Sequence, residues 1–363
     1  MSAGIGVIGA GTISDTYLKN LTAFGDTRVV FVADLLPDRA AAQAERFGVP
    51  GSGTVDRLLT CEDVEIVVNL TIPAAHAEVA AAALRAGKHV WQEKPLAVDL
   101  TEAGRLLDLA REKGLRIACA PDTVLGPGIQ SALRVIRSGS IGAPITGSAR
   151  FQSSGPDRWH PSPEFLFQAG GGPLFDIGPY YLTTLAHVFG PAKRVTATGV
   201  RAHERRVVQA GPRAGTVFDV TEPTTVNALI EFRNGSSSQF SVSFDSGVSS
   251  ASIEVTGNAG TVAFPDPNQF DGATRLHPVP VTEPTTINVD PYPAGRGIGV
   301  VDLVRSIRTA VPERAGGRIA YHTLEVMTAI DRAARAGEPV VIDSVFDEVP
   351  LLPEDWDPFA VTG

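Results

Sequence analysis

Two glycines between a short apolar strand and an amphipathic helix constrain this chain more than any other feature. Residues 5–8 are apolar, Gly9-Ala10-Gly11 follows, and Ile13, Tyr17 and Leu21 then fall on one face of a helix. A glycine turn at the start of a helix lets backbone N–H groups approach an anion. The segment therefore predicts the strand, turn and helix that open a dinucleotide-binding domain.

Each residue of this turn has a predicted role. Gly9 permits the tight turn, and Gly11 lets the backbone approach a pyrophosphate. The free N–H groups at the start of the helix, at Thr12 and Ile13, face the anion. Ser14 stands where a third glycine is typical, and its small side chain can still fit between helix and strand.

Asp34 ends the second predicted strand, 20 residues beyond Ser14. A carboxylate at this place accepts hydrogen bonds from the ribose hydroxyls and repels a 2′-phosphate. Leu35 and Leu36 follow without a cation, and Arg39 is the nearest positive charge. The pattern therefore favours NAD over NADP as the cofactor.

The first third of the chain alternates strands and helices. Apolar strands are predicted at 5–8, 29–33, 66–70, 89–92 and 115–120, with a helical pattern after each of the first four. Strands that are apolar on both faces are typical of a parallel sheet covered by helices. Residues 1–122 are therefore predicted to form a Rossmann domain with a doubly wound parallel sheet.

The rest of the chain, 123–363, follows another pattern and is predicted to be the substrate and oligomerisation domain. Its strands alternate in character, and Asn234-Gly235 suits a type I′ hairpin turn. We expect an open, mostly antiparallel sheet with helices on one face. A Pro-rich loop is predicted over 264–297, and the last helix, 319–336, either stays in this domain or packs back on the first. The other predicted elements are a helix at 129–136, strands at 145–152, 194–200, 225–232, 238–244, 251–255 and 339–342, and a helix at 300–310.

Composition excludes several classes of partner and site. The 363 residues carry 31 basic and 40 acidic side chains, and the net charge of −9 argues against nucleic acid or a membrane surface as partner. Cys61 and Cys119 lack further Cys or His at ligand spacing, so no disulfide framework and no metal site are predicted. No apolar run reaches the roughly 18 residues that span a bilayer. We therefore expect a soluble, cytoplasmic protein.

Two further motifs extend the pattern. The first, Glu93-Lys94-Pro95, follows the fourth strand, at the edge where open parallel sheets bind ligands. The second runs from the glycine cluster at 170–172 through Asp176 to Tyr180. Together with two shorter motifs, they resemble the glucose-fructose oxidoreductase, inositol dehydrogenase and rhizopine-catabolism (Gfo/Idh/MocA) family. The shorter motifs are Thr71-Ile72-Pro73 with His76, and Ala86-Gly87-Lys88-His89-Val90.

This resemblance implies an NAD(P)-dependent dehydrogenase or reductase that acts on a CH–OH group of a sugar, anhydrosugar or cyclitol. It implies cofactor contacts at Thr71, Pro73, His76, Glu93 and Lys94, although His76 could equally cap its helix. It also implies a homodimer or homotetramer through the open sheet. The second motif ends in tyrosine, as in glucose-fructose oxidoreductase. Inositol-dehydrogenase-like members of the family have histidine at that position.

Hydride chemistry needs a residue that handles a proton. When a secondary alcohol gives up a hydride, its hydroxyl proton passes to a positioned base. We assign Tyr180 as the general acid/base and Lys94 as the hydrogen-bond donor to the reacting oxygen. Asp176 is assigned as the carboxylate that orients both Lys94 and the substrate. The sequence is equally compatible with the tyrosine and the lysine exchanging these roles.

A Pro-rich segment before the glycine cluster offers a substrate loop. Trp159 has a flat ring on which a sugar can stack, and Arg158 and His160 can bind hydroxyls. A plain surface loop held by its prolines is the alternative. Two other functions stay open for the whole chain: an NAD-dependent glycoside hydrolase that oxidises its substrate transiently, and a non-catalytic regulator that binds nucleotide or sugar.

Overall fold

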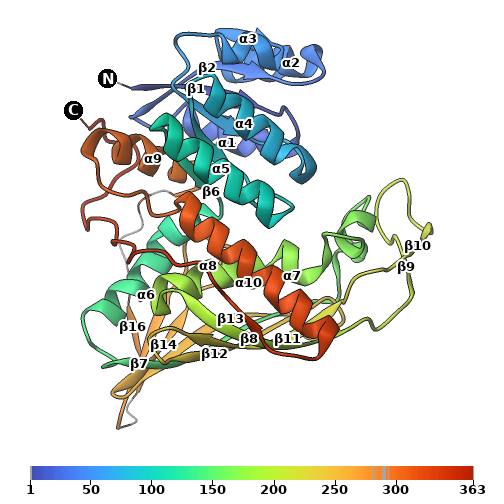
Figure 1. Ribbon diagram of the computed structural model, residues 1–363, viewed down its shortest axis with the longest axis vertical. Helices are drawn as coiled ribbons and strands as arrows, with labels where there is room; N and C mark the ends of the chain where they lie inside the picture. The colour runs from blue at the N-terminus through green and yellow to red at the C-terminus, as the bar shows by residue number, and fades with distance from the viewer. Residues whose placement is uncertain (1, 281–282, 288–291, 293, 363) are drawn as a thin grey trace. The chain divides into compact units, whose positions relative to one another are not determined.

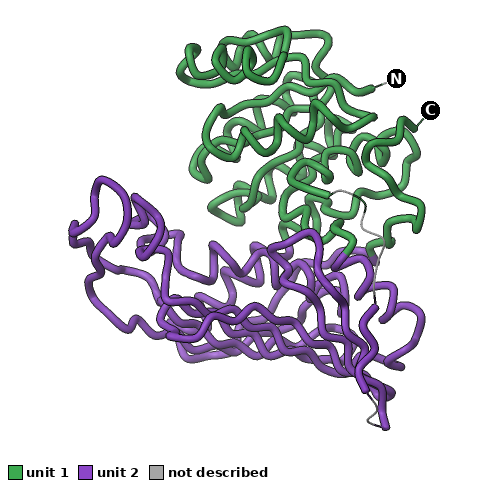
Figure 2. Tube along the Cα trace, turned by 180° about the vertical axis from the view of Figure 1, so that it is seen from behind, with its two compact units in different colours: residues 1–127, 290–321, 349–363 green, residues 128–289, 322–348 purple. Residues whose placement is uncertain are grey.

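The computed structural model describes residues 2–280, 283–287, 292 and 294–362, and its chain divides into two compact units (Figure 2). Unit 1 comprises residues 1–127, 290–321 and 349–363, and unit 2 comprises residues 128–289 and 322–348. The predicted division at 122 therefore separates two segments, 290–321 and 349–363, from the unit to which they belong. Contacts between residues far apart in the sequence cause the difference, and sequence order does not reveal them.

Asp26 provides one of these distant contacts within unit 1. Its carboxylate is fully buried and accepts hydrogen bonds from Arg305 Nε and Arg308 Nη1, each at 2.8 Å, and from the backbone N of Thr362 at 3.0 Å. A buried carboxylate needs such partners because its removal from water is costly. The late segments of the chain thus complete the first unit.

The described part of unit 1 contains a six-stranded parallel sheet in the order β3-β2-β1-β4-β5-β6 (Figure 1). This confirms the doubly wound parallel sheet, and the order reverses between β1 and β4, where such sheets bind their ligands. The strand β3 and the short helix α3 were not predicted, because Gly-Ser-Gly lacks the residues typical of strands. The strands are β1 (Ala3–Ile8), β2 (Thr27–Ala33), β3 (Gly51–Gly53), β4 (Ile66–Asn69), β5 (His89–Gln92) and β6 (Ile117–Cys119). The helices are α1 (Thr12–Leu21), α2 (Pro37–Phe47), α3 (Val55–Leu59), α4 (His76–Arg85), α5 (Leu100–Lys113) and α9 (Ile298–Thr309).

In the described part of unit 2, nine strands form a mixed sheet in the order β16-β15-β14-β13-β7-β12-β11-β8-β17. All neighbours are antiparallel except β7 and β12, so the expected open, mostly antiparallel sheet is confirmed. Helices α6, α8 and α10 lie on one side of it (Figure 1). The strands are β7 (Pro144–Gln152), β8 (Ala192–Val200), β11 (Thr225–Phe232), β12 (Ser237–Ser243), β13 (Ser250–Gly257), β14 (Gly260–Phe264), β15 (Thr274–Pro278), β16 (Thr285–Ile287) and β17 (Val340–Val341). The helices are α6 (Pro127–Arg137), α7 (Gly172–Asp176), α8 (Gly178–Phe189) and α10 (Gly317–Ala336), most of which belongs to this unit.

Two local predictions in unit 2 need correction. The predicted loop over 264–297 contains β15 and β16, which extend the sheet by pairing with β14 and with each other; residues 281–282, 288–291 and 293 of that loop lie outside the described residues. The hairpin at Asn234-Gly235 does join β11 to β12, but only Gly235 has a positive φ, of 91°. A type I′ turn needs positive φ at both central residues. Asn234 instead accepts a hydrogen bond from Ser236 N at 3.0 Å through its side chain.

His322 gives unit 2 a predicted dependence on pH. The ring is 1% exposed, its Nε2 accepts a hydrogen bond from Ala192 N at 3.0 Å, and its Nδ1 lies 2.7 Å from Ser344 Oγ. Burial lowers the pKa of His322 from 6.5 to about 4. The neutral ring of His322 therefore contributes fully to folding stability above pH 6.5. This contribution is lost as the pH falls from 6.5 towards 4, because the unfolded chain takes up a proton first. We expect urea unfolding to show about 3 kcal/mol less stability at pH 4 than at pH 7 from this group.

The matched comparison for this prediction is His322→Gln against His277→Gln, because His277 is exposed. The first change should flatten the dependence of unfolding free energy on pH, and the second should leave it as in the wild type. Equal slopes in all three proteins would show that another group governs the acid response.

Candidate functional site

The glycine turn of unit 1 has the geometry that the sequence predicts. Gly9 has φ of +105°, and a Cβ at this residue would lie 2.7 Å from the carbonyl carbon and oxygen of Leu70. Only glycine fits there without strain. Gly11 precedes α1, and a Cβ built on it would meet nothing within 4 Å. Thr12 and Ile13 are exposed beside it, so the N–H groups at the start of α1 are open to an anion.

Ser14 fits between helix and strand in place of a third glycine. The residue is fully buried, and its Oγ donates a hydrogen bond to the carbonyl oxygen of Gly11 at 2.6 Å. Gln43 Nε2 donates to the same hydroxyl at 3.3 Å. These bonds satisfy the hydroxyl, so its burial carries little cost.

Asp34 is held at the end of β2 by two backbone N–H groups. Its Oδ2 accepts from Ala10 N at 2.7 Å, and its Oδ1 accepts from Leu36 N at 2.9 Å. The first bond joins the carboxylate directly to the glycine turn. Each oxygen keeps further acceptor capacity, which suits a ribose diol. Leu35 beside it is 92% exposed.

A buried polar network joins the ends of β4 and β5. Asn69 and Gln92, the last residues of these strands, are fully buried, and Asn69 Nδ2 donates to Gln92 Oε1 at 2.9 Å. Asn69 Oδ1 accepts from Thr71 Oγ1 at 2.7 Å, which fixes the turn after β4. Ile72 and Pro73 in that turn are exposed. Sequence reasoning missed both amides, although polar residues ending two apolar strands were a usable signal.

His76 belongs to the same network. Its ring is 1% exposed, with Nδ1 at 2.7 Å from the carbonyl oxygen of Pro95 and Nε2 at 3.1 Å from that of Thr71. Burial lowers the pKa of His76 below 6.5. The two ring nitrogens thus face carbonyl groups of the segments that follow β4 and β5. His76 neither caps α4 through its side chain nor exposes its ring.

Glu93 and Lys94 follow β5, where the sequence predicts them. Glu93 is half-buried, its Oε1 accepts from Tyr17 Oη at 2.8 Å, and its Oε2 accepts from the backbone N of Lys94 at 3.0 Å. The peptide bond between Lys94 and Pro95 is cis. The hydrogen bond to Glu93 Oε2 holds the backbone N of Lys94 at the carboxyl edge of the sheet.

Two other buried side chains of this region, Trp91 and Asp122, were missed in the sequence. Trp91 Nε1 donates to Tyr17 Oη at 3.2 Å, and a Cβ on Gly299 would overlap the Trp91 ring. Asp122 is fully buried and accepts from Gly297 N at 2.8 Å, so it anchors the segment that leads into α9. Burial raises the pKa of Asp122. No local pattern signals these contacts, because their partners lie far apart in the sequence.

Unit 2 carries the second predicted motif. Gly170 and Gly172 have φ of +81° and +79°, and α7 and α8 follow. The backbone of Ile177 between these helices stays near helical values, so Asp176 and Tyr180 are one turn apart. Asp176 is half-buried and Tyr180 is 6% exposed. Since Lys94 belongs to unit 1, the meeting of all three residues remains a prediction.

The predicted substrate loop lies in unit 2 with an exposed aromatic surface. Trp159 is 67% exposed, and its ring centroid lies 5.6 Å from that of His160, which lies 5.5 Å from that of Phe165. His160 Nδ1 accepts a hydrogen bond from Ser162 N at 3.0 Å, and Arg158 is exposed. Phe165, which is 59% exposed, was not singled out in the sequence.

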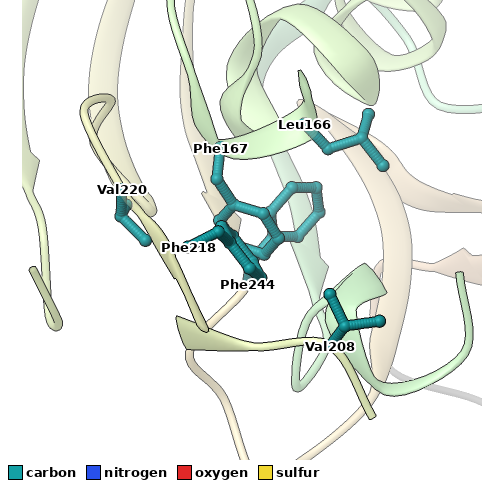
Figure 3. Close-up of a cluster of buried hydrophobic side chains, with 6 residues drawn as sticks. All are labelled: Leu166, Phe167, Val208, Phe218, Val220 and Phe244. Atoms are coloured by element: carbon teal, nitrogen blue, oxygen red, sulfur yellow. The ribbon is translucent and has the colours of Figure 1, made fainter. Parts of the chain in front are cut away.

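Arg206 joins this loop to the segment that follows β12. Arg206 belongs to β9 (Arg205–Val207), which pairs with β10 (Val217–Asp219). Its Nη1 donates to Asp157 Oδ1 at 2.8 Å, it also forms an ion pair with Asp245, and its Cζ lies 5.0 Å from the centre of the Phe167 ring. Phe167 packs in a buried apolar cluster with five other side chains (Figure 3). They are Leu166, Val208, Phe218, Val220 and Phe244.

Comparison with known proteins decides the family. Residues 3–120 match an oxidoreductase family with an NAD-binding Rossmann fold, and residues 129–263 match the C-terminal domain of the same family. The chain belongs to the Gfo/Idh/MocA oxidoreductase family. Its first unit is an NAD-binding Rossmann domain, which confirms the predicted cofactor and fold.

Individual members of the Gfo/Idh/MocA family resemble this chain over different lengths. The dTDP-3,4-didehydro-2,6-dideoxy-alpha-D-glucose 3-reductase of Streptomyces violaceoruber is 35% identical over 211 residues, 58% of this chain and 61% of the reductase. The match thus spans less than two thirds of that relative. The 1,5-anhydro-D-fructose reductase of Ensifer adhaerens is 28% identical over 260 residues, 71% of this chain and 74% of the reductase.

A solved structure gives the same fold. A levoglucosan dehydrogenase in complex with NADH has a TM-score of 0.82 at 22% identity, covering 95% of this chain and all 100% of that protein. Within the described residues, no helix is long and apolar enough to cross a membrane. In the same part of the chain, no group of three or more His, Cys, Asp or Glu side chains could hold a metal ion.

Proposed function

We propose that this protein is an NAD-dependent dehydrogenase, or a ketoreductase in the reverse direction, for a secondary hydroxyl of a sugar, anhydrosugar or cyclitol. This proposal rests on the position of Lys94, whose backbone N is held by the Glu93 carboxylate just after β5. This sheet edge also bears the open turn at Gly11 and the anchored Asp34 carboxylate. The reductases of sugar derivatives among its relatives support the substrate class.

The cofactor would be held by residues of unit 1. Gly9, Gly11, Thr12 and Ile13 would cradle the pyrophosphate, and Asp34 would accept hydrogen bonds from the adenosine ribose. The exposed Pro73 and the turn at Thr71 would line the nicotinamide side, next to Glu93 and Lys94. His76 would act through Thr71 and Pro95, because its buried ring contacts their carbonyl groups. Bound NAD supplies the hydride acceptor, and NADH the donor.

The protein's own task is to hold the substrate and move one proton. Tyr180 would take the hydroxyl proton as the carbonyl forms, and Lys94 would donate a hydrogen bond to the same oxygen. Asp176, one helical turn before Tyr180, would orient the lysine and a neighbouring hydroxyl of the substrate. The exchange of roles between Tyr180 and Lys94 gives the same overall reaction.

The aromatic loop would add binding of the sugar ring. Trp159 presents its face for stacking, and Arg158 and His160 present donors to hydroxyl groups. Its firm attachment through Arg206 supports a binding role, since a rigid loop loses little entropy when it binds. An unchanged KM in Trp159→Ala would remove this loop from substrate binding.

The sheet face opposite the helices would join subunits into a homodimer or homotetramer. Its exposed side chains are mostly polar, so we expect a hydrogen-bonded interface that analytical ultracentrifugation would detect; a monomer at micromolar concentration would contradict it. They include Ser148, Arg150, Thr196, Asn227, Gln239 and Glu254. We also propose a cytoplasmic location, which the two free cysteines suit and cell fractionation tests.

A panel of sugars, anhydrosugars and cyclitols, followed by absorbance at the NADH wavelength, tests the proposed function. We expect turnover with at least one member of the panel. Cleavage of a glycoside without net NADH would favour the NAD-dependent glycoside hydrolase. Binding of NAD or a sugar without turnover of any panel member would instead favour the non-catalytic regulator.

A further inference from the structure

A chain of three hydrogen bonds leads from two buried side chains, through the half-buried Glu93, to the backbone of Lys94. Trp91 Nε1 donates to Tyr17 Oη at 3.2 Å, and Tyr17 Oη donates to Glu93 Oε1 at 2.8 Å. The other carboxylate oxygen, Oε2, accepts from the backbone N of Lys94 at 3.0 Å. Tyr17 lies on α1, so this chain connects the cofactor helix with the lysine.

The direction of these bonds is determined by the groups themselves. Tyr17 and Trp91 are both fully buried. Burial, reinforced by the charge of Glu93, raises the pKa of Tyr17 well above 10, so the phenol keeps its hydrogen. An indole N–H can only donate, and therefore the single phenol hydrogen is left for Glu93. The carboxylate then accepts one hydrogen bond on each oxygen.

A carboxylate is needed at Glu93 for this arrangement. Both of its oxygens face donors, the Tyr17 hydroxyl and the Lys94 amide. An amide side chain would place an NH₂ group against one of these donors. A glutamate at position 93 is therefore the side chain that suits both the Tyr17 hydroxyl on α1 and the amide of Lys94.

We propose that Tyr17 is a positioning residue that fixes Lys94 through the Glu93 carboxylate. The inference rests on the proposed role of Lys94 in proton and hydrogen-bond chemistry. Tyr17 is fully buried, so it does not contact a bound substrate. Tyr17 affects catalysis by keeping Lys94 in place, because even a small displacement of a reactive group lowers the rate of the chemical step steeply.

Tyr17→Phe tests this inference, with Tyr181→Phe as the matched control. Both tyrosines are fully buried, but among the described residues none hydrogen-bonds to the Tyr181 hydroxyl. The first readout is hydrogen exchange of the Lys94 amide, measured by NMR or mass spectrometry. We expect exchange at least about 10-fold faster in Tyr17→Phe and unchanged in Tyr181→Phe, because only the former frees the Glu93 carboxylate.

The second readout is kinetic, with a substrate identified in the panel. Tyr17→Phe should lower kcat about 10-fold and leave the Kd for NADH within about twofold, and Tyr181→Phe should change neither. Unchanged Lys94 exchange in Tyr17→Phe would overturn the inference, whatever the activity. Faster exchange with normal kcat would also overturn it, because positioning would then be irrelevant to catalysis. Wild-type activity in Lys94→Met would instead contradict the proposed function.

Discussion

Lys94→Met is expected to lower kcat by about 100-fold or more while the Kd for NADH stays nearly constant. Removal of the ammonium takes away the donor to the reacting oxygen, and such groups typically contribute 10²- to 10⁴-fold. The backbone anchors of this segment, Glu93 and Pro95, are unaffected by the change. Stopped-flow measurement of NADH formation and fluorescence titration of NADH separate the two effects.

Lys113→Met provides the matched control, since Lys113 is exposed in the last turn of α5. It should keep wild-type kinetics. Tyr180→Phe should lose about as much activity as Lys94→Met, and the double variant should lose less than the product of the two effects. Independent, fully multiplying losses would contradict a shared reacting oxygen.

The second large effect is expected from two glycines that respond differently to the same added methyl group. Gly9→Ala should cost about 3 kcal/mol or more in unfolding free energy, because φ is +105° and the Cβ would lie 2.7 Å from Leu70. Gly11→Ala should stay within about 1 kcal/mol of the wild type, since its Cβ meets nothing within 4 Å. It should nevertheless weaken NAD binding about 10-fold or more.

Thermal unfolding without NAD and calorimetric titration with NAD distinguish these outcomes. The expected pattern is a low Tm for Gly9→Ala and a normal Tm with weak binding for Gly11→Ala. Wild-type affinity in Gly11→Ala would show that the pyrophosphate does not approach this turn. A normal Tm in Gly9→Ala would mean that the turn can rearrange around a side chain.

Much of the candidate cofactor site was predictable because its signals are local. The φ of Gly9, the open start of α1 and the place of Asp34 all follow from a strand, a turn and a helix within about 30 consecutive residues. Glu93-Lys94 was located in the same way, as residues that follow a buried strand. Parallel strands bring these ends to one edge, so their approach needed no knowledge of packing.

The contacts that hold Lys94 were not predictable in this way. Tyr17 and Glu93 are 76 positions apart, and Tyr17 reads in the sequence as one more apolar position of a helix. His76 was predicted as a cofactor contact or a cap, and its ring caps no helix but is buried against Thr71 and Pro95. Its contact with the cofactor stays a prediction. Such contacts depend on the orientation in which the helices pack against the sheet. The spacing of residues in the sequence does not determine that orientation.

The Rossmann pattern, the family motifs and the type of chemistry could be inferred from the amino-acid sequence alone, because hydrophobic period, glycine turns and strand-end residues are properties of short segments. The composition of unit 1, the ion pairs of Asp26 and the hydrogen bonds that lead from Trp91 to Lys94 became visible only in the folded chain. Burial forces each polar group to find a partner, and that partner is set by proximity in the folded chain rather than in the sequence.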